Sequence, residues 1–410
     1  MNTATMRRID RWLGGPMCMI LTAYRRVTSP LRAAPPATPQ RIVVVKLAEQ
    51  GAWVVAYGAL RRATELVGRE NVFLMTFDEN RFVIDQLDLV PASNVIEVRT
   101  NNTLHVVIDL LRAVRRARRE RIDAALDFEF FARSSTILCF LSGASRRVGF
   151  HPTGGEASYR GDLLTHRLAF NSRLHVSETF QLIVEALSVD PSVLPALDLA
   201  TPRPELPPLT VVTPSELDEV SALVQSQLVG ADPLPPLILL NANAGDLLPL
   251  RRWPADRYVT LAHRLLEHDP RLVVVFTGGP SEAGESARLA AQVASPRCVS
   301  MGGRTSLRQL VVLYSLAEVL VTNDSGPAHY AALAPIDIVT LFGPESPKVF
   351  GSLSPRHRAL WAELPCSPCV NAYNDRTTRC RDNLCMQHIS VDEVFTATIE
   401  AYERRCAAAS

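Results

Sequence analysis

Short β-branched runs alternate with stretches of helical spacing along most of the chain, and this alternation restricts the fold more than any other feature. Residues 41–47 (Arg-Ile-Val-Val-Val-Lys-Leu) contain an apolar run typical of a strand buried on both faces of a parallel sheet. A turn, a helical stretch and further strands follow, and the same pattern resumes after residue 208. Strands that alternate with helices predict an α/β fold with two doubly wound parallel sheets in tandem.

The apolar runs and the turn residues between them place the expected elements. The expected strands cover residues 41–47, 71–76, 94–98, 124–128, 236–241, 271–277, 298–300, 318–322 and 337–342. The expected helices cover residues 54–66, 103–121, 255–268, 282–294 and 306–315. Neither half carries a G-x-G-x-x-G fingerprint, which argues against an NAD-type dehydrogenase.

Proline-rich segments divide the chain. Residues 31–40 and 195–208 have the composition of linkers. We therefore predict a basic and apolar leader with its linker over residues 1–40, an N-terminal domain over 41–200 and a C-terminal domain over 209–400. The formal net charge of +1 gives no reason to expect a nucleic-acid partner.

The leader places an apolar segment between two groups of arginines, Arg7-Arg8 and Arg25-Arg26. No apolar run reaches the roughly 18–20 residues of a membrane span. The preferred interpretation is a short interfacial helix, with arginines toward anionic headgroups and Trp12 and Leu13 in the acyl boundary. A helix docked on the protein itself and a secretory signal peptide are the alternatives.

One segment near the C-terminus combines a strand end, a tight turn and a helix start. Residues 318–322 form the expected strand, and Asn-Asp-Ser-Gly-Pro follows at 323–327. Pro327 suits the first turn of a helix, whose free N–H groups and positive dipole end favour an anion. Gly326 lets a ligand approach the backbone, and His329 could reach the same anion. The alternative is an ordinary turn capped by Asp324 or Ser325, with His329 packed.

This segment and three others resemble glycosyltransferase family 9, the ADP-heptose:lipopolysaccharide heptosyltransferases. The others are Arg-Arg-Trp-Pro at 251–254, Thr-Gly-Gly-Pro-Ser-Glu at 277–282 and Val-Thr-Leu-Phe-Gly-Pro at 339–344. The resemblance covers most of residues 41–400 and is stronger in the C-terminal half. It implies the GT-B architecture, two Rossmann-like doubly wound domains facing a cleft. It also implies inverting transfer of a heptose-like sugar from a nucleotide-diphosphate donor to a lipid-linked saccharide.

The resemblance assigns the donor site to the C-terminal domain. There, Arg251 would hold the diphosphate and offset charge on the leaving group, and Glu282 would accept hydrogen bonds from the ribose hydroxyls. The implied donor-binding residues are Asn243, Arg251, Glu282, Asp324, Ser325, Gly326 and His329. The alternatives are a solvated basic pair for Arg251-Arg252 and helix capping for Glu282. No metal or other cofactor is required for this chemistry.

The first turn of the N-terminal domain departs from the family. Members carry Gly-Asp, with the Asp as general base, where this chain has Gly51-Ala52. Glu49 lies in the same turn and is our candidate for a substitute base. Asp127 or Glu129, a plain solvated Glu49 and the absence of catalysis are the alternatives.

Basic residues of the N-terminal domain are candidates for the acceptor. The resemblance points to Arg146, Arg160 and His166 as acceptor contacts. Residues 112–121 also contain six arginines. The preferred interpretation is a solvated helix surface, and the alternative is attraction to a phosphorylated glycolipid or an anionic membrane.

Four cysteines gather between residues 366 and 385. Cys366, Cys369, Cys380 and Cys385 could form a structural zinc site, with reduced thiols and disulfides as alternatives. The other four cysteines are scattered, which favours a reducing cytosol over a disulfide framework.

The sequence thus predicts a cytoplasmic glycosyltransferase that lies on the inner face of the cytoplasmic membrane. Its expected partners are a nucleotide-sugar donor, a phosphorylated glycolipid or saccharide acceptor and the inner membrane. A different nucleotide-sugar transferase or epimerase of the same fold is one rival. A nucleotide-sugar or glycan-binding protein without catalysis, to which Ala52 points, is the other.

Overall fold

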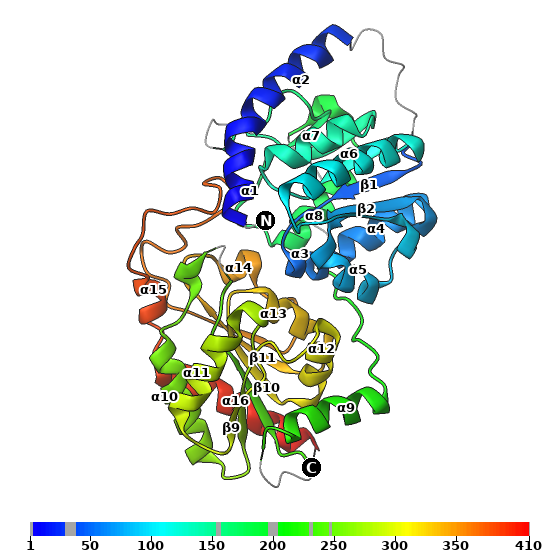
Figure 1. The fold of residues 1–410 in the computed structure, drawn as a ribbon. Coiled ribbons are helices and arrows are strands. Elements are labelled where there is room, and N and C mark those ends of the chain that lie inside the picture. Colours follow the sequence, from blue (N-terminus) through cyan, green and yellow to red (C-terminus); the bar gives the residue numbers. More distant parts are fainter. Residues whose placement is uncertain are drawn as a thin grey trace. The chain divides into compact units, whose positions relative to one another are not determined.

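The computed structural model describes residues 3–28, 38–152, 157–195, 204–228, 233–245 and 248–409. The chain forms two compact units, Met1–Glu205 with Asn371–Thr377, and Leu206–Val370 with Thr378–Ser410. Each unit holds a six-stranded parallel sheet with helices on both faces (Figure 1). The predicted fold class of two Rossmann-like sheets is therefore confirmed. Most of the two predicted linkers, residues 31–37 and 196–203, lies outside the described residues.

The first sheet has the strand order β3-β2-β1-β4-β5-β6. Its strands are β1 (Ile42–Val45), β2 (Val72–Phe77), β3 (Val95–Val98), β4 (Ala124–Asp127), β5 (Arg146–Phe150) and β6 (His166–Leu168). Ile42 pairs with Val72 on one side and with Ala124 on the other, so the strand order reverses at β1. In open α/β sheets the crevice at such a switch point, outside the carboxyl ends of the strands, is where ligands bind.

Helices cover both faces of this sheet. They are α3 (Gln50–Val55), α4 (Tyr57–Val67), α5 (Arg81–Leu87), α6 (Thr103–Arg119), α7 (Arg133–Leu141) and α8 (Val176–Glu185). The short helices η3 (Arg69–Asn71), η4 (Asp78–Asn80), η5 (Ala92–Asn94), η6 (Ala186–Ser188) and η7 (Pro191–Val193) join them. One apolar cluster unites Val43 and Val45 of β1 with Ala113 of α6 and Leu138 of α7, so α6 and α7 share one face of the sheet.

The leader is helical and packs on the first unit. It comprises α1 (Thr3–Ile9), a π-helical turn η1 (Asp10–Gly14) and α2 (Gly15–Thr28). The Asp10 carboxylate accepts hydrogen bonds from the N–H groups of Arg133 and Ser134 at the start of α7. Cys18 is buried against Phe140 and Leu163. The leader is thus docked on its own protein, and its contact with a membrane stays a prediction. No helix in the described part of the chain is long and apolar enough to span a bilayer.

The second sheet has the order β12-β11-β10-β7-β8-β9, which repeats the arrangement of the first. Its strands are β7 (Leu237–Asn241), β8 (Val273–Phe276), β9 (Cys298–Ser300), β10 (Val319–Asn323), β11 (Asp337–Phe342) and β12 (His357–Trp361). The switch point lies between β7 and β10, where Val319 pairs with Ile238.

Its helices are α9 (Pro214–Gln225), α10 (Ala255–His268), α11 (Ala283–Val293), α12 (Leu307–Leu316), α13 (Gly326–Tyr330), α14 (Pro347–Phe350), α15 (Leu384–Gln387) and α16 (Val391–Ala409), with the turns η8 (Pro249–Arg251), η9 (Pro280–Glu282) and η10 (Ala331–Leu333). Trp253, fully buried, anchors the turn before α10 by donating from its indole N–H to the carbonyl of Ile389.

Candidate active site

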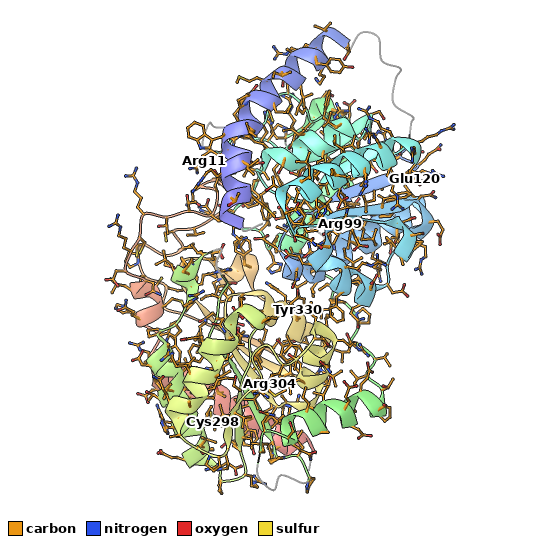
Figure 2. All side chains as sticks on the ribbon, in the orientation of Figure 1. Arg11, Arg99, Glu120, Cys298, Arg304 and Tyr330 are labelled. Atoms are coloured by element: carbon orange, nitrogen blue, oxygen red, sulfur yellow. The ribbon has the colours of Figure 1, made fainter. Side chains whose placement is uncertain are left out.

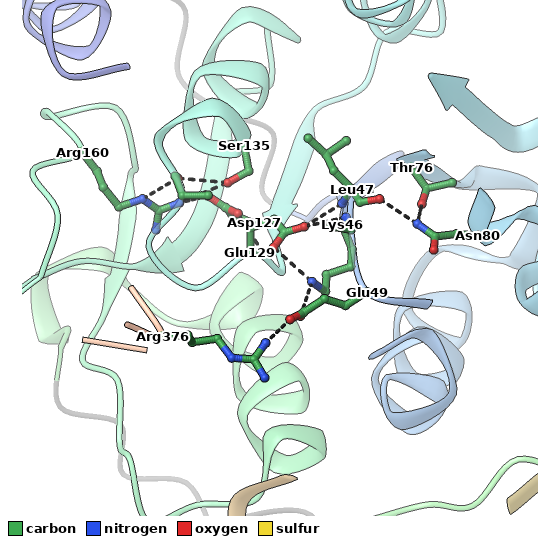
Figure 3. Close-up of polar contacts among 12 residues, drawn as sticks. Lys46, Leu47, Glu49, Thr76, Asn80, Asp127, Glu129, Ser135, Arg160 and Arg376 are labelled. Carbon is green, nitrogen blue, oxygen red and sulfur yellow. Dashed lines mark hydrogen bonds and ion pairs between the residues drawn. The ribbon is translucent and has the colours of Figure 1, made fainter. Parts of the chain in front are cut away.

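Charged side chains gather at the switch point of the first sheet, where β1 and β4 end (Figure 3). Lys46 follows β1, and its Nζ lies 3.1 Å from Glu49 Oε2 and 3.0 Å from Glu129 Oε2. The other oxygen of Glu129 accepts from the N–H groups of Leu47 and Ala48, at 2.8 and 3.0 Å. Glu129 therefore fixes the turn that carries Glu49, and Lys46 joins the two carboxylates.

Lys46 is buried, with only 1% of its side chain exposed. Burial lowers the pKa of Lys46, but the carboxylates of Glu129 and Glu49 more than offset this, so its pKa lies above the ordinary value. The ammonium group therefore remains charged in the folded protein, and it holds one side of Glu49.

Asp127 and Arg160 form a second, fully buried pair beside this cluster. Arg160 donates to the carbonyls of Phe130 and Phe150, both at 2.7 Å, as well as to Asp127. Burial raises the pKa of Asp127, and Arg160 opposes the shift. Arg160 has no exposed surface, so contact with an acceptor would require it to give up these bonds. In the described structure it braces the loops after β4 and β5.

Exposure separates the three candidate bases. The side chain of Glu49 is 30% exposed and that of Glu129 15%, whereas Asp127 is fully buried. Glu49 also has a left-handed backbone, with φ of 70°, which is uncommon for a residue other than glycine. Ala52 lies in the first turn of the following helix, and its N–H donates to the carbonyl of Glu49. Glu49 is thus the carboxylate of this cluster that a substrate can reach most readily.

A segment from far along the sequence completes the cluster. Residues 371–377 belong to the first unit, and Arg376 forms an ion pair with Glu49 (Figure 3). Asp375 accepts from the Ser158 hydroxyl at 3.1 Å, and the Tyr373 ring stacks on Phe131. Nothing local in the sequence links Arg376 to residue 49, so this ion pair was not predicted.

The other two predicted acceptor residues lie elsewhere. Arg146 is the first residue of β5 and His166 the first of β6. Arg146 therefore lies at the amino ends of the parallel strands, the edge opposite the one that carries Glu49. Burial, with Arg146 and Arg147 nearby, lowers the pKa of His166. The structure does not bring these two residues together with Glu49.

In the second unit, two asparagines build the switch point. Asn323, at the end of β10, accepts from the N–H of Trp253 and donates to the carbonyls of Ala242 and Asn243. Asn241, at the end of β7, accepts from the N–H of Asn243. These bonds join the loop after β7 to the loop after β10. From the sequence, Asn241 was placed at a strand end and Asn323 in the turn after a strand, and neither was predicted to have this role.

Arg251 is buried at this edge between two carboxylates. Its Nη1 lies 3.3 Å from Glu345 Oε2 and 4.0 Å from Asp324 Oδ2, and its Nη2 donates to the carbonyl of Ala244. Among the described residues its Nε has no hydrogen-bond partner. The predicted donor residues Arg251 and Asp324 are therefore brought together. Glu345, which is fully buried, was missed although it directly follows the Gly343-Pro344 turn.

The remaining predicted donor residues line neighbouring loops. Asn243 is buried, and its Nδ2 has no partner among the described residues. Glu282 accepts a hydrogen bond from the N–H of Gly279 at 2.9 Å. It therefore caps a helical turn, which was the alternative interpretation of this residue. Ser325 precedes α13 without a side-chain cap, and Gly326 and His329 lie within that short helix. A cavity of about 490 Å³ borders Asn243, Trp253 and Arg257.

The four clustered cysteines do not form a metal site in the described structure. Cys366 and Cys380 are exposed, Cys369 is partly buried and Cys385 is buried, and none of the four is in a disulfide. Burial raises the pKa of Cys385 to about 11, and the neighbouring Cys369, Cys380 and Cys366 add to the shift. Among the described residues, no group of three or more His, Cys, Asp or Glu side chains is arranged to hold a metal ion.

Comparison with known proteins decides the family. The model of glycosyltransferase family 9 (heptosyltransferase) matches residues 110–378. The chain belongs to glycosyltransferase family 9. It is 29% identical over 235 residues to lipopolysaccharide heptosyltransferase 2 of Escherichia coli K12, covering 55% of this chain and 61% of that protein. It is 31% identical over 219 residues to lipopolysaccharide heptosyltransferase 2 of Salmonella typhimurium, covering 51% and 58%.

Solved structures of family 9 proteins share the fold. The E. coli ADP-heptose lipopolysaccharide heptosyltransferase II has a TM-score of 0.66 at 20% identity, covering 89% of this chain and 99% of that one. The E. coli heptosyltransferase WaaC with ADP has a TM-score of 0.57 at 15% identity, covering 88% and 99%. At these identities the likeness concerns the fold. In sequence, the chain spans about three fifths of the length of the curated relatives.

Proposed function

We propose that this family 9 chain transfers a heptose from ADP-heptose to a lipopolysaccharide-type, lipid-linked acceptor, with inversion at the anomeric carbon. The observation that carries the proposal is the reachable Glu49 carboxylate at the switch point of one sheet, together with the loop framework around Arg251 at the switch point of the other. The relatives named above support the sugar and the acceptor class, and the structure of WaaC with ADP supports the nucleotide.

On the donor side, Arg251 is the group proposed to receive the diphosphate. Its guanidinium pairs with Glu345 and Asp324 in the described structure, and its Nε donor has no partner there. A phosphate oxygen would satisfy that donor, and the guanidinium would offset charge on the departing diphosphate. Asn243, Ser325, Gly326 and His329 border the same loops, and Glu282 is proposed for the ribose hydroxyls.

On the acceptor side, Glu49 is the proposed general base. It removes the proton of the acceptor hydroxyl while that oxygen bonds to the anomeric carbon. The bond from the anomeric carbon to the diphosphate oxygen breaks, and the diphosphate leaves with the electron pair. Lys46 and Arg376 orient the carboxylate in this step. The acceptor contacts expected of Arg146, Arg160 and His166 carry no step, because the first and last lie away from Glu49 and Arg160 is fully buried.

A second candidate is a nucleotide-sugar or glycan-binding protein without turnover. It is favoured by Ala52, which stands where the family carries its acid, and by the two cations that already hold Glu49. An epimerase would differ from both, since it would change the donor sugar without any acceptor. Product analysis with and without acceptor separates the three.

Calorimetric titration with ADP, UDP and GDP tests the donor site directly. We expect ADP to bind most tightly and Glu282→Ala to weaken it by about 1–3 kcal/mol if the carboxylate accepts from two ribose hydroxyls. Because Glu282 also caps η9, the thermal unfolding of the Glu282→Ala variant is measured as well. Glu267→Ala, at an exposed position of α10 that does not line the cavity, is the matched control. Preference for UDP or GDP would exclude ADP-heptose, and no binding to any of the three would contradict the donor site.

The remaining expectations belong to the same proposal. We place the chain at the inner face of the cytoplasmic membrane, as its lipid-linked acceptor requires. The structural zinc expected at Cys366, Cys369, Cys380 and Cys385 takes no part in the mechanism. Elemental analysis of the purified protein, with Cys380→Ser as comparison, tests it: about one zinc per chain, lost in the variant, would support the site.

A further inference from the structure

Exposed apolar side chains are concentrated on one part of the first unit. Of the seventeen large hydrophobic side chains that are exposed among the described residues, eight lie on the N-terminal helical segment, residues 3–28, and three on α6. They are Ile9, Trp12, Leu13, Met17, Met19, Ile20, Tyr24 and Val27, and Leu104, Val107 and Leu111. Monomeric water-soluble proteins rarely gather so many, and such patches mark interaction surfaces.

The two elements flank a common neighbour on one face of the sheet. Helix α7 packs against α2 and η1 on one side and against α6 on the other. Cys18 of α2 lies in an apolar cluster with Phe140 of α7, and Leu138 of α7 shares another with Ala113 of α6. Helices α2, α7 and α6 therefore form one layer over this face of the sheet (Figure 1), and its outer helices α2 and α6 both carry exposed apolar side chains.

The orientation of α2 is inverted relative to an ordinary surface helix. Gly14 of η1 and Cys18 and Thr22 of α2 are turned toward the protein, and these residues are small or polar. A Cβ on Gly161 would lie 2.5 Å from the Thr22 hydroxyl, so this packing is close. The opposite side presents Leu13 of η1 and Ile20 and Val27 of α2, which are 64%, 64% and 77% exposed. A surface helix normally exposes its polar side, so the outward side of α2 lacks its natural environment in water.

The charges on this surface are basic. Arg11 of η1, labelled in Figure 2, and Arg26 of α2 have side chains that are 66% and 73% exposed, and each forms a long ion pair, with Asp375 at 3.9 Å and with Asp162 at 3.8 Å. On α6 the apolar half is followed by Arg112, Arg115, Arg118 and Arg119, all exposed. The acids on the two elements are engaged elsewhere: Asp10 caps α7, and Asp109 is buried in ion pairs with Arg99 and Arg112.

We propose that the outward sides of α2 and α6 form one docking surface, by which the first unit lies on a bilayer with anionic headgroups. Apolar side chains at helical spacing would enter the acyl boundary, and the arginines would face phosphate groups. Only the role of this surface rests on the proposed function: docking would bring the unit that carries Glu49 to a lipid-linked acceptor. It also changes the interpretation of the arginine-rich helix, which becomes part of a membrane surface.

Vesicle co-sedimentation of the full chain tests the surface. The vesicles contain phosphatidylcholine alone or an equal mixture with phosphatidylglycerol, at low and high salt. We expect binding to the anionic vesicles that weakens with salt. The pairs Ile20→Ser with Val27→Ser, and Val107→Ser with Leu111→Ser, should each lower it by at least about tenfold. The control pair Val193→Ser with Val211→Ser removes equally exposed side chains elsewhere and should leave binding unchanged.

Three results would overturn the proposal. The wild-type chain could ignore both vesicle types, the control pair could lower binding as much as the test pairs, or sedimentation velocity could show a dimer that the test pairs dissociate. The last result would assign the surface to a second copy of the chain. The assay contains neither donor nor acceptor, and ADP titration of the same samples reports the donor site separately. Failure of the surface and failure of the proposed function are therefore distinguishable.

Discussion

At the scale of single residues, Glu49 is the side chain on which turnover depends. Glu49→Gln keeps the size of the side chain but removes the proton acceptor, so we expect kcat to fall at least about a hundredfold with ADP affinity unchanged. Adding Ala52→Asp to that variant returns an acid to the first turn of α3, and we expect part of the activity to return. Initial rates with a saccharide acceptor measure both. Unchanged turnover in Glu49→Gln would exclude it as the base.

Arg376 is expected to act on turnover through Glu49. Removing its charge with Arg376→Gln removes this ion pair from the carboxylate, while the ion pair with Lys46 remains. We expect kcat to drop by about tenfold while the KM for the donor stays constant, because orientation is lost and donor binding is not. Arg376→Lys should recover part of the rate. Arg379→Gln, an exposed arginine three residues away, is the control, and an equal loss there would contradict a specific role.

The sequence allowed Glu49 to be predicted because it lies in the same turn as the missing family acid. It did not reveal that Arg160 is fully buried, since an arginine in a polar loop resembles a surface residue until its partner Asp127 is located in space. Glu345 and Arg376 were missed for the same reason. Their partners, Arg251 and Glu49, are distant in sequence, and charge pairing over such separations has no local signature.

At the scale of elements, the docking of α2 depends on Gly161. This residue has φ of 66°, and a Cβ there would lie 2.5 Å from the Thr22 hydroxyl and 2.8 Å from the Cys18 carbonyl. We expect Gly161→Ala to lower the free energy of unfolding by about 1–3 kcal/mol and to loosen α2. Burial raises the pKa of the Cys18 thiol to about 11, so the docked thiol reacts slowly. Alkylation mapped by mass spectrometry should show faster labelling of Cys18 in the variant.

Gly143→Ala is the matched control for that experiment. Gly143 also has a left-handed backbone, with φ of 90°, but its nearest neighbour outside the turn is the Arg118 side chain. The substitution should therefore destabilise through backbone strain while Cys18 stays protected. Equal labelling of Cys18 in both variants would mean that strain alone, and not the contact with α2, explains the effect.

The predicted elements that were confirmed are those with continuous β-branched runs, such as β1, β8 and β10, because burial on both faces of a parallel sheet demands such runs. Three strands, β5, β6 and β12, were not predicted. β5 begins with Arg-Arg, β6 has three residues, and the outer strand β12 is only partly buried, so none shows an apolar run. Arg146 and His166, which were predicted as acceptor contacts, are the first residues of β5 and β6.

At the scale of the whole molecule, the two units are expected to differ in their response to acid. Burial, together with Arg167 and Arg160, lowers the pKa of His151 in the first unit from 6.5 to about 4, and burial also lowers that of His166. Between these pH values the unfolded chain binds protons that the folded unit does not, so stability falls as pH drops from about 6.5 toward 4. In the second unit, hydrogen bonds from Arg308 and Arg271 lower the pKa of Glu216 and Asp269, so their contribution is lost only below about 4.5.

Differential scanning calorimetry at several pH values should therefore show that the melting temperature of the first unit falls at a higher pH than that of the second unit. The two units can unfold in separate transitions. The transition of the first unit is the one whose melting temperature Gly161→Ala lowers. Between pH 6.5 and 4.5 we expect that transition to fall while the other stays nearly constant. His151→Gln cannot take up the proton in either state, so it should reduce the fall, whereas His263→Gln on the exposed side of α10 should not. If both transitions fell together, or if His151→Gln left the slope unchanged, the buried histidine would not be the source of the acid sensitivity.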